Sequence, residues 1–242
     1  MIDPGKEFLE KTKCSSLSES AQSKGLPCPP LETPQPDAQL IDLPSPDHLK
    51  IGDVDIKQLI TQRRSRRQFS GKQLGIEQLT WLLWAITGVK QQNKNTTLRT
   101  VPSAGARHPF DIYLAINNVA SLKPGLYRYL ALDHKLAVIR ESSDINAAVT
   151  EACLQQNWIL SSNATIFWVA VPYRAEWRYV ERAWRYMFLD AGHSCQNLYL
   201  SCEAIGAGTC AVAAYDDDAV NKLLELDGEE RFAIYVAPLG VQ

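Results

Sequence analysis

The feature that most limits how this chain can fold is an uninterrupted apolar run of strand length, Ala164–Val171. A strand that is apolar on both faces belongs in the interior of a sheet that helices cover. Periodicity predicts further strands at residues 112–116, 126–130, 136–139 and 232–237, and helices at residues 74–88, 145–160, 176–205 and 216–224. This order of elements predicts an α+β fold with a mixed or antiparallel sheet flanked by helices.

The longest predicted helix, residues 176–205, carries small side chains at spacings of three and four. This face consists of Ala191, Ser194, Cys195, Leu198, Ser201, Cys202 and Ile205. Small residues let a second helix approach closely, so we expect the face to pack either in the core of the chain or across a dimer axis.

Residues 1–45 differ in composition from the rest of the chain. Residues 1–50 hold eight of the thirteen prolines, many Ser, Glu and Gln, and few large apolar residues. Such a segment cannot bury enough apolar surface to offset its ordering entropy. We therefore expect residues 1–45 to form a Pro-rich arm, extended or partly disordered, that lies across the rest of the chain or contacts a partner subunit. Residues 46–242 are expected to form one globular domain.

The overall charge and hydropathy argue against several classes of function. The formal net charge of −2 does not favour bulk electrostatic binding to nucleic acid or to an anionic membrane. No window approaches the ~18 consecutive apolar residues of a membrane span, and Met1–Ser20 has no apolar segment typical of a secretory signal. The six cysteines show no C-x-x-C spacing. We expect a cytoplasmic protein that binds neither nucleic acid nor membrane.

A short basic run, residues 63–67 (RRSRR), brings four guanidinium groups and a hydroxyl together. Guanidinium is permanently charged and presents a planar fork of donors, so the run is a natural clamp for phosphate. It follows the C-terminal end of a helix predicted to begin at Asp53. Because a helix C-terminus repels anions, the side chains themselves would have to bind the phosphate. A solvated charge run and a nucleic-acid patch are the alternative interpretations.

Two stretches of small residues lie further along the chain. Residues 101–109 (VPSAGARHP) form a loop ahead of a strand, and residues 206–215 (GAGTCAVAAY) predict a strand and turn with little side-chain bulk. Small side chains let another group approach the backbone, so that N–H and C=O groups of the loop can meet a flat ring. A plain loop bounded by two prolines is the alternative.

Other chemistries find little support in the sequence. Asp190 and His193, spaced i, i+3 with Cys195 nearby, lack further ligands at a fitting spacing, so we expect no metal site. The chain has no Ser/His/Asp motif, Gly-rich nucleotide fingerprint or P-loop. Neither a hydrolase nor a kinase is therefore supported.

Five blocks in register resemble the FMN-dependent nitroreductase family, and specifically its SagB-type dehydrogenase branch, over about residues 40–240. The blocks are Arg63–Phe69, Leu82–Ala85, Pro102–Ala106, Asp190–His193 with Gln196–Leu198, and Pro238–Gly240. The resemblance implies that residues 46–242 form a nitroreductase-like FMN-binding domain. It also implies a homodimer with two FMN sites at the interface, each built from both chains, and a dimer surface formed largely by the long helix.

The resemblance further implies roles for individual residues. Phosphate and ribityl contacts fall on Arg63, Arg64, Ser65 and Arg67, the loop facing the isoalloxazine falls on Pro102, Ser103, Ala104 and Gly105, and the backbone N–H near flavin N5 falls on Ala213, with Ala214 beside it. A backbone donor at N5 stabilises the charge that appears on reduction, and only small side chains let the strand reach the ring.

The chain departs from the pattern of the family at three places. The family often carries a basic residue beyond the final glycine, whereas this sequence ends in Val241-Gln242, so we expect one phosphate ligand fewer, with Arg66 as a substitute. His108 replaces an aromatic or aliphatic residue of the pocket wall. The Lys-Tyr pair of azoline-oxidising members corresponds to Arg178 and Tyr179. These two are the candidate catalytic residues, although a guanidinium is a poor general base.

The resemblance implies an FMN-dependent oxidoreductase that works by two-step hydride transfer through flavin N5, reducing nitroaromatic or quinone acceptors with NAD(P)H. One alternative is a SagB-type dehydrogenase that uses oxygen to oxidise a peptide or small-molecule substrate, such as an azoline. The other is a non-catalytic flavin-binding or interaction protein whose Pro-rich arm is the binding element.

Overall fold

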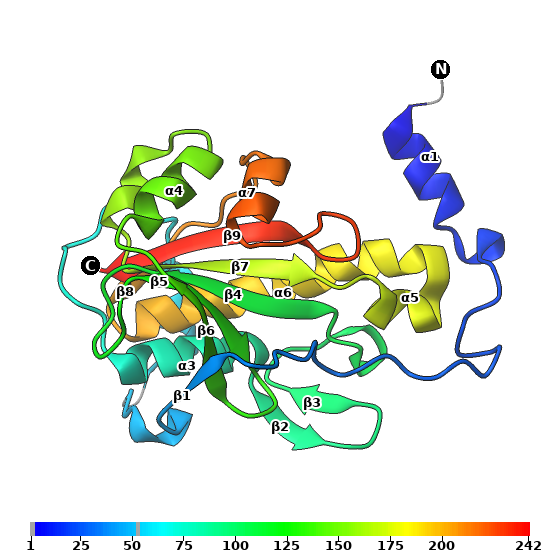
Figure 1. Ribbon diagram of the computed structural model, residues 1–242, viewed down its shortest axis with the longest axis horizontal. Helices are drawn as coiled ribbons and strands as arrows, with labels where there is room; N and C mark the ends of the chain where they lie inside the picture. Colours follow the sequence, from blue (N-terminus) through cyan, green and yellow to red (C-terminus); the bar gives the residue numbers. More distant parts are fainter. Residues whose placement is uncertain (1–2, 52–53) are drawn as a thin grey trace.

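The computed structural model describes residues 3–51 and 54–242, and its main element is a seven-stranded sheet (Figure 1). The strands are β1 (Gln39–Asp42), β4 (Phe110–Ile116), β5 (Gly125–Leu130), β6 (Lys135–Glu141), β7 (Ala164–Ala170), β8 (Ala207–Thr209) and β9 (Phe232–Val241). They lie in the order β1-β6-β5-β4-β7-β9-β8, and every neighbouring pair is antiparallel. The predicted α+β class is confirmed, with an antiparallel sheet.

The apolar run predicted as an interior strand is β7. All of its residues are buried, and it pairs with β4 on one side and β9 on the other. Successive side chains of a strand point to opposite faces. Accordingly, Ile166 and Trp168 belong to one hydrophobic cluster, and Phe167 and Val169 to a second cluster on the other face.

Helices cover both faces of this sheet (Figure 1). The α-helices of the described residues are α1 (Pro4–Lys11), α2 (Ile56–Gln62), α3 (Ile76–Thr87), α4 (Ile145–Ala152), α5 (Tyr173–Tyr179), α6 (Ala183–Ala204) and α7 (Asp217–Leu223). α3 and α6 pack on the face of Ile166 and Trp168, whereas α4 and α7 pack on the face of Phe167 and Val169. No helix within the described ranges is both long and apolar enough to cross a membrane.

The long helix expected from the sequence is α6, and a break precedes it. The stretch predicted as one helix forms α5 and α6, because Val180 between them has a φ of 43°, outside the helical range. The small-residue face lies in the core of the chain, where Leu198 and Cys202 are fully buried. Near the N-terminal end of α6, Phe188 and Leu189 are exposed.

Residues 89–100, a polar stretch rich in Asn, Gln and Thr, form a hairpin. Its strands are β2 (Val89–Gln92) and β3 (Thr97–Arg99). Arg99 anchors the hairpin, since its buried guanidinium donates to Thr87 Oγ1 (2.7 Å) and Thr97 Oγ1 (3.0 Å). Burying this arginine orders a segment whose polar composition gave no periodic signal.

Two helix boundaries also differ from the prediction. The helix predicted at residues 145–160 ends as α4 at Ala152, because Leu154 and Gln155 adopt positive φ. The predicted N-cap Asp53 lies outside the described residues, and the N-cap of α2 is Asp55.

The arm lies along the body of the chain (Figure 1). α1 projects outward, and the chain then runs to β1, which pairs with β6. Between these elements, Thr33 accepts hydrogen bonds from two buried arginines: its backbone oxygen from Arg128 Nη2 (2.8 Å) and its Oγ1 from Arg174 Nη2 (2.7 Å). Gln35 Oε1 accepts from Arg128 Nη1 (3.1 Å). Contacts made by the arm thus extend into a buried polar cluster of the domain.

Asp111 is the carboxylate at the centre of that cluster. Its Oδ1 lies 2.8 Å from Arg174 Nη1 and its Oδ2 lies 3.1 Å from Arg128 Nη2, and all three side chains are buried. Burial acts to raise the pKa of Asp111, but the charges of Arg174 and Arg128 more than offset it and hold the pKa below its usual value. The cluster therefore joins β4, β5 and α5 through buried ion pairs. Each of these charges would carry a large desolvation cost if it were unpaired.

We expect Asp111→Ala to lower the free energy of unfolding by about 3–5 kcal/mol at pH 7, because two arginines then stay buried without their carboxylate. The control is Glu141→Ala, which breaks only the exposed pair with Lys123. Urea unfolding followed by tryptophan fluorescence measures both. Because the pKa of Asp111 is lowered in the folded state, the ionised carboxylate contributes its full stabilisation above about pH 4. This stabilisation is lost as the pH falls through the lowered pKa of Asp111. The difference between wild type and Asp111→Ala must then shrink in acid, and equal unfolding midpoints at pH 7 would refute the prediction.

Candidate active site

The basic run is held against the edge strand β8. Arg63 is the C-cap of α2, and the chain then passes alongside Thr209, where Ser65 forms a parallel bridge and Arg66 N–H donates to the Thr209 carbonyl (2.9 Å). A Cβ on Gly208 would lie 2.5 Å from Arg66 Cγ. The absence of a side chain at Gly208 is therefore what lets the run approach β8.

Four arginines of the run have different surroundings. The guanidinium of Arg63 lies over the ring of Tyr199 (5.3 Å), and that of Arg67 lies over Trp158 (6.0 Å). In contrast, Arg66 pairs with Glu203 (3.3 Å), and Arg64 Nη1 donates to the carbonyls of residues 61 and 63 at the end of α2 (3.0 Å each). Within residues 3–51 and 54–242, neither Arg63 nor Arg67 has an acidic partner.

The small-residue stretch, residues 206–215, contains β8 and continues beyond the contact with the run at Thr209. Val212 pairs with Val236 through two backbone hydrogen bonds, and beyond it Ala213 and Ala214 are exposed. Ala214 O accepts from Gln156 Nε2 (2.9 Å). The Ala213 N–H has no acceptor among the described residues. The structure thus brings the basic run and the alanine stretch to the same edge of the sheet.

Tyr199 of α6 connects these two groups. Its hydroxyl accepts the N–H of Ala211 (2.8 Å) and lies 3.3 Å from Ser65 Oγ. Nothing in the sequence singled out this tyrosine, since it is one aromatic residue on a long helix whose pattern predicts core packing.

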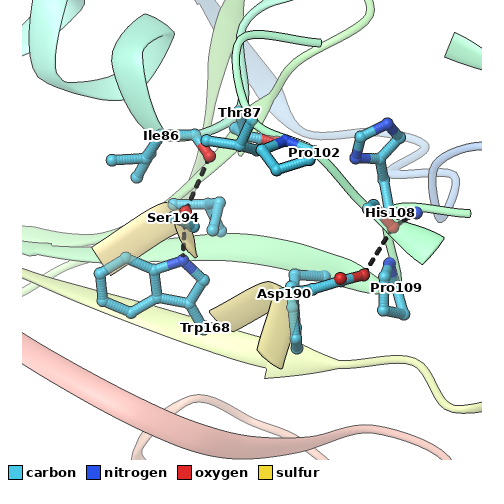
Figure 2. Close-up of a pocket in the computed structure, with 12 residues that line it drawn as sticks. Ile86, Thr87, Pro102, His108, Pro109, Trp168, Asp190 and Ser194 are labelled. Carbon is cyan, nitrogen blue, oxygen red and sulfur yellow. Dashed lines mark hydrogen bonds between the residues drawn. The ribbon is translucent and has the colours of Figure 1, made fainter. Parts of the chain in front are cut away.

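The loop that follows Val101 is anchored to α6 by Asp190 (Figure 2). Ser103 Oγ donates to Asp190 Oδ2 (2.6 Å), Ala104 N–H approaches Oδ1 (3.4 Å), and His108 N–H donates to Ser103 Oγ (2.9 Å). Burial raises the pKa of Asp190, while the hydrogen bond from Ser103 acts to lower it. The adjoining cavity of about 10 Å³ has room for about one water molecule. Asp190 therefore holds the loop, a role that the sequence did not indicate.

His108, expected in a wall of the substrate pocket, is buried in the core. Its Nε2 bonds with the carbonyl of Thr97 (3.1 Å), and burial lowers its pKa to about 3. The neutral ring therefore supports the hairpin β2–β3.

Arg178 and Tyr179 at the end of α5 meet the loop at Gly105. This glycine has a φ of 55°, and a Cβ there would collide with the hydroxyl of Tyr179 and lie 3.3 Å from Arg178 Cδ. Tyr179 packs edge-on against Tyr186, with ring centroids 4.9 Å apart. The predicted catalytic pair and the predicted isoalloxazine-facing loop are thus neighbours within one chain.

The loop and the basic run, however, lie apart. Asp190 holds the loop and Tyr199 contacts the run, and these residues are nine positions apart on α6. At 1.5 Å and 100° per residue, nine positions correspond to about 13 Å along the axis and about half a turn around it. The residue that anchors the loop and the residue that contacts the run therefore lie on different sides of α6.

No group of three or more His, Cys, Asp or Glu side chains in the described part of the chain is arranged to hold a metal ion. Asp190, which the sequence offered as one member of such a group, is instead bonded to Ser103.

A model of the nitroreductase family matches residues 60–241. The chain belongs to the nitroreductase family. A protein of Methanocaldococcus jannaschii named as a candidate nitroreductase is 29% identical over 204 residues, which cover 84% of this chain and 97% of that protein. The crystal structure of an Anabaena variabilis protein, also named as a candidate nitroreductase, has a TM-score of 0.76 at 28% identity and covers 97% of this chain.

A further relative is the trifolitoxin-processing protein TfxB of Rhizobium leguminosarum bv. trifolii. It is 29% identical over 136 residues, which cover 53% of this chain and 36% of TfxB. This chain also covers 45% of the Anabaena protein. It thus spans less than half the length of these two relatives, whereas it matches nearly the whole M. jannaschii protein.

Nitroreductases are FMN-dependent oxidoreductases and are generally homodimeric. The enzyme class and the cofactor predicted from the sequence are therefore confirmed. The donors of this chain fit FMN: two guanidinium groups without an acidic partner in the described residues suit a phosphate, and an exposed N–H between small side chains suits a flat ring.

Asp190→Ala should loosen the loop without unfolding the chain. Losing hydrogen bonds to a carboxylate costs about 1.5–3 kcal/mol, so amide hydrogen exchange at residues 104–108 should be about 10- to 100-fold faster. Asp190→Asn keeps the shape and one acceptor, and we expect it to give a smaller increase. Mass-spectrometric hydrogen exchange measures both variants, with β5 and β6 as internal references. Unchanged exchange in Asp190→Ala would show that the loop is held by other contacts.

Proposed function

We propose that this chain reduces nitroaromatic or quinone acceptors with NAD(P)H, in the cytoplasm. The observation that carries the proposal is a pair of guanidinium groups, the half-buried Arg63 and the exposed Arg67. Neither has an acidic partner in the described residues, and both belong to the run that pairs with β8. The chemistry that FMN supplies when bound is hydride transfer through N5 in two steps, from the donor to the acceptor.

The basic run provides the phosphate site in this proposal. Arg63 and Arg67 act as charged donors and Ser65 as a hydroxyl donor. Arg64 contributes less, because its guanidinium already donates to carbonyls at the end of α2. Arg66 contributes little to the phosphate site, since its charge is paired with Glu203.

The alanine stretch provides the ring site. The N–H of Ala213 is a fixed dipole that needs no reorganisation to stabilise negative charge that develops beside it. Ala213 and Ala214 are exposed and have the smallest side chains that still carry a Cβ. A ring can therefore approach this backbone closely.

We infer that the chain forms a homodimer in which residues 46–242 are the FMN-binding domain and residues 1–45 are an added arm. Pro102, Ser103, Ala104 and Gly105 of one chain would then contact the flavin bound by the basic run of the other. The offset of about 13 Å and half a turn along α6 supports this exchange, because it places the anchor of the loop on a different side of the helix from the residue that contacts the run. Exposed Phe188 and Leu189 on α6 offer apolar surface for such an interface.

A second candidate function is that of a SagB-type dehydrogenase, which uses oxygen to oxidise a peptide or small-molecule substrate. The likeness to the trifolitoxin-processing protein favours it. Arg178 argues against oxidation of an azoline by proton abstraction, because a guanidinium does not deprotonate in proteins. Tyr179 remains as a hydroxyl that can donate to substrate, next to Gly105. Rapid bleaching of the bound flavin by NADH would support the reductase and exclude a dehydrogenase that does not use NADH.

The phosphate site is tested by the double substitution of Arg63 and Arg67 with Ala. Two charge-assisted contacts are lost, so the binding free energy of FMN should weaken by about 3–6 kcal/mol. The dissociation constant of FMN should then rise roughly 10²- to 10⁴-fold. Arg66→Ala is the control, because it removes an arginine of the same run that is paired with Glu203. Fluorescence titration measures FMN affinity, and circular dichroism checks the fold. An unchanged affinity in the double variant would refute this phosphate site.

Tyr179→Phe tests whether hydride transfer here needs a protein acid. We expect turnover with NADH and a quinone to fall less than about tenfold, whereas an essential general acid would contribute about 10²–10⁴-fold. Tyr186→Phe is the matched control, since Tyr186 is the neighbouring tyrosine and its hydroxyl accepts from Arg182 (3.0 Å). Loss of turnover in Tyr179→Phe with FMN still bound would assign Tyr179 an acid role.

A further inference from the structure

Tyr199 contacts both halves of the site that the basic run and the alanine stretch form. Its ring faces the guanidinium of Arg63, and its hydroxyl lies between the N–H of Ala211 (2.8 Å) and Ser65 Oγ (3.3 Å). The side chain is partly buried against the hydrophobic cluster of α3, α6 and the sheet. Packing therefore holds the ring of Tyr199 in place, and only the direction in which its hydroxyl proton points can change.

The donors and acceptors around the Tyr199 hydroxyl limit the direction in which its proton can point. An amide N–H can only donate, so Ala211 occupies an acceptor position of the Tyr199 hydroxyl. The tyrosine retains one proton to donate, and Ser65 Oγ is the hydroxyl within reach. If Tyr199 donates to Ser65, the single proton of Ser65 is left to point away from α6. If Ser65 donates to Tyr199, Ser65 has no proton left for a ligand.

We propose that Tyr199 is a positioning residue that orients the hydroxyl of Ser65 as a donor to the phosphate of FMN. The inference rests on the proposed phosphate site and adds a residue to it. Tyr199 acts through Ser65 and does not itself touch the phosphate. A phosphate oxygen accepts only, so binding it selects the arrangement in which Ser65 donates outward and Tyr199 donates to Ser65.

A double-mutant cycle on FMN affinity tests this role. Tyr199→Phe keeps the ring under Arg63 and removes only the hydroxyl, and we expect it to raise the dissociation constant of FMN about tenfold. Ser65→Ala should give a similar loss. Because Tyr199 acts through Ser65, Tyr199→Phe added to Ser65→Ala should change the affinity by less than about twofold.

Riboflavin, which lacks the phosphate, provides a second readout. Its affinity should be equal for wild type and Tyr199→Phe, so the preference for FMN over riboflavin should fall by the same factor of about ten. The control is Tyr127→Phe in β5, which removes a tyrosine hydroxyl that donates to the carbonyl of Lys123 (2.8 Å). It should change neither affinity. Thermal unfolding without flavin shows whether each variant is folded.

The outcomes separate this inference from the proposed function. Independent losses in the double-mutant cycle, or equal losses for FMN and riboflavin, would show that the Tyr199 hydroxyl supports the strand and does not orient Ser65. Unchanged FMN affinity in Tyr199→Phe would also overturn the inference while leaving the phosphate site in place. A wild type that binds no FMN would refute the proposed site, and the role of Tyr199 with it.

Discussion

Residues 65 and 66 run alongside Thr209 of β8, and this pairing determines where the other groups of the site can lie. It places the basic run next to the strand that continues to Ala213, and it requires Gly208, since Arg66 occupies the space of a side chain there. The last strand, β9, pairs with β8 and so fixes the edge that the run adjoins. This backbone pairing therefore positions the arginines of the run.

The chain treats its buried and exposed charges in opposite ways. Asp111 lies between Arg128 and Arg174 in the interior, where an unpaired charge would cost several kcal/mol. Nearer the surface, Arg67 is exposed and Arg63 is half-buried, so solvent reduces the cost of leaving both without an acidic partner among the described residues. The arm contributes to the interior cluster through Thr33 and Gln35. The arm thus supplies acceptors to buried arginines, whereas within the run Arg64 and Arg66 are engaged and Arg63 and Arg67 have no acidic partner among the described residues.

Sequence patterns predicted the elements whose periodicity is local. The buried strand Ala164–Ala170 and the helix Ile76–Thr87 follow from apolar spacing alone, and the sheet follows from the order of elements. The hairpin at residues 89–99 depends on burying Arg99 against Thr87, which is a tertiary contact with no periodic signal. For the same reason the break at Val180 and the roles of Asp190 and Tyr199 could not be predicted. Each depends on what packs against α6 and not on its own sequence.

The geometry of α6 also explains why a set of matching motifs does not define a site. The loop and the basic run both belong to the motifs that resemble the family. Asp190, which anchors the loop, and Tyr199, which contacts the run, nevertheless lie on different sides of α6. An α-helix with its side chains is about 10–12 Å across, so groups on different sides of it are separated by at least that width. The proposed homodimer accounts for this separation, because a second chain would supply the loop to the run. Asp190 and Tyr199 are both interior positions of α6 (Ala183–Ala204), so one helix positions both groups while keeping them apart.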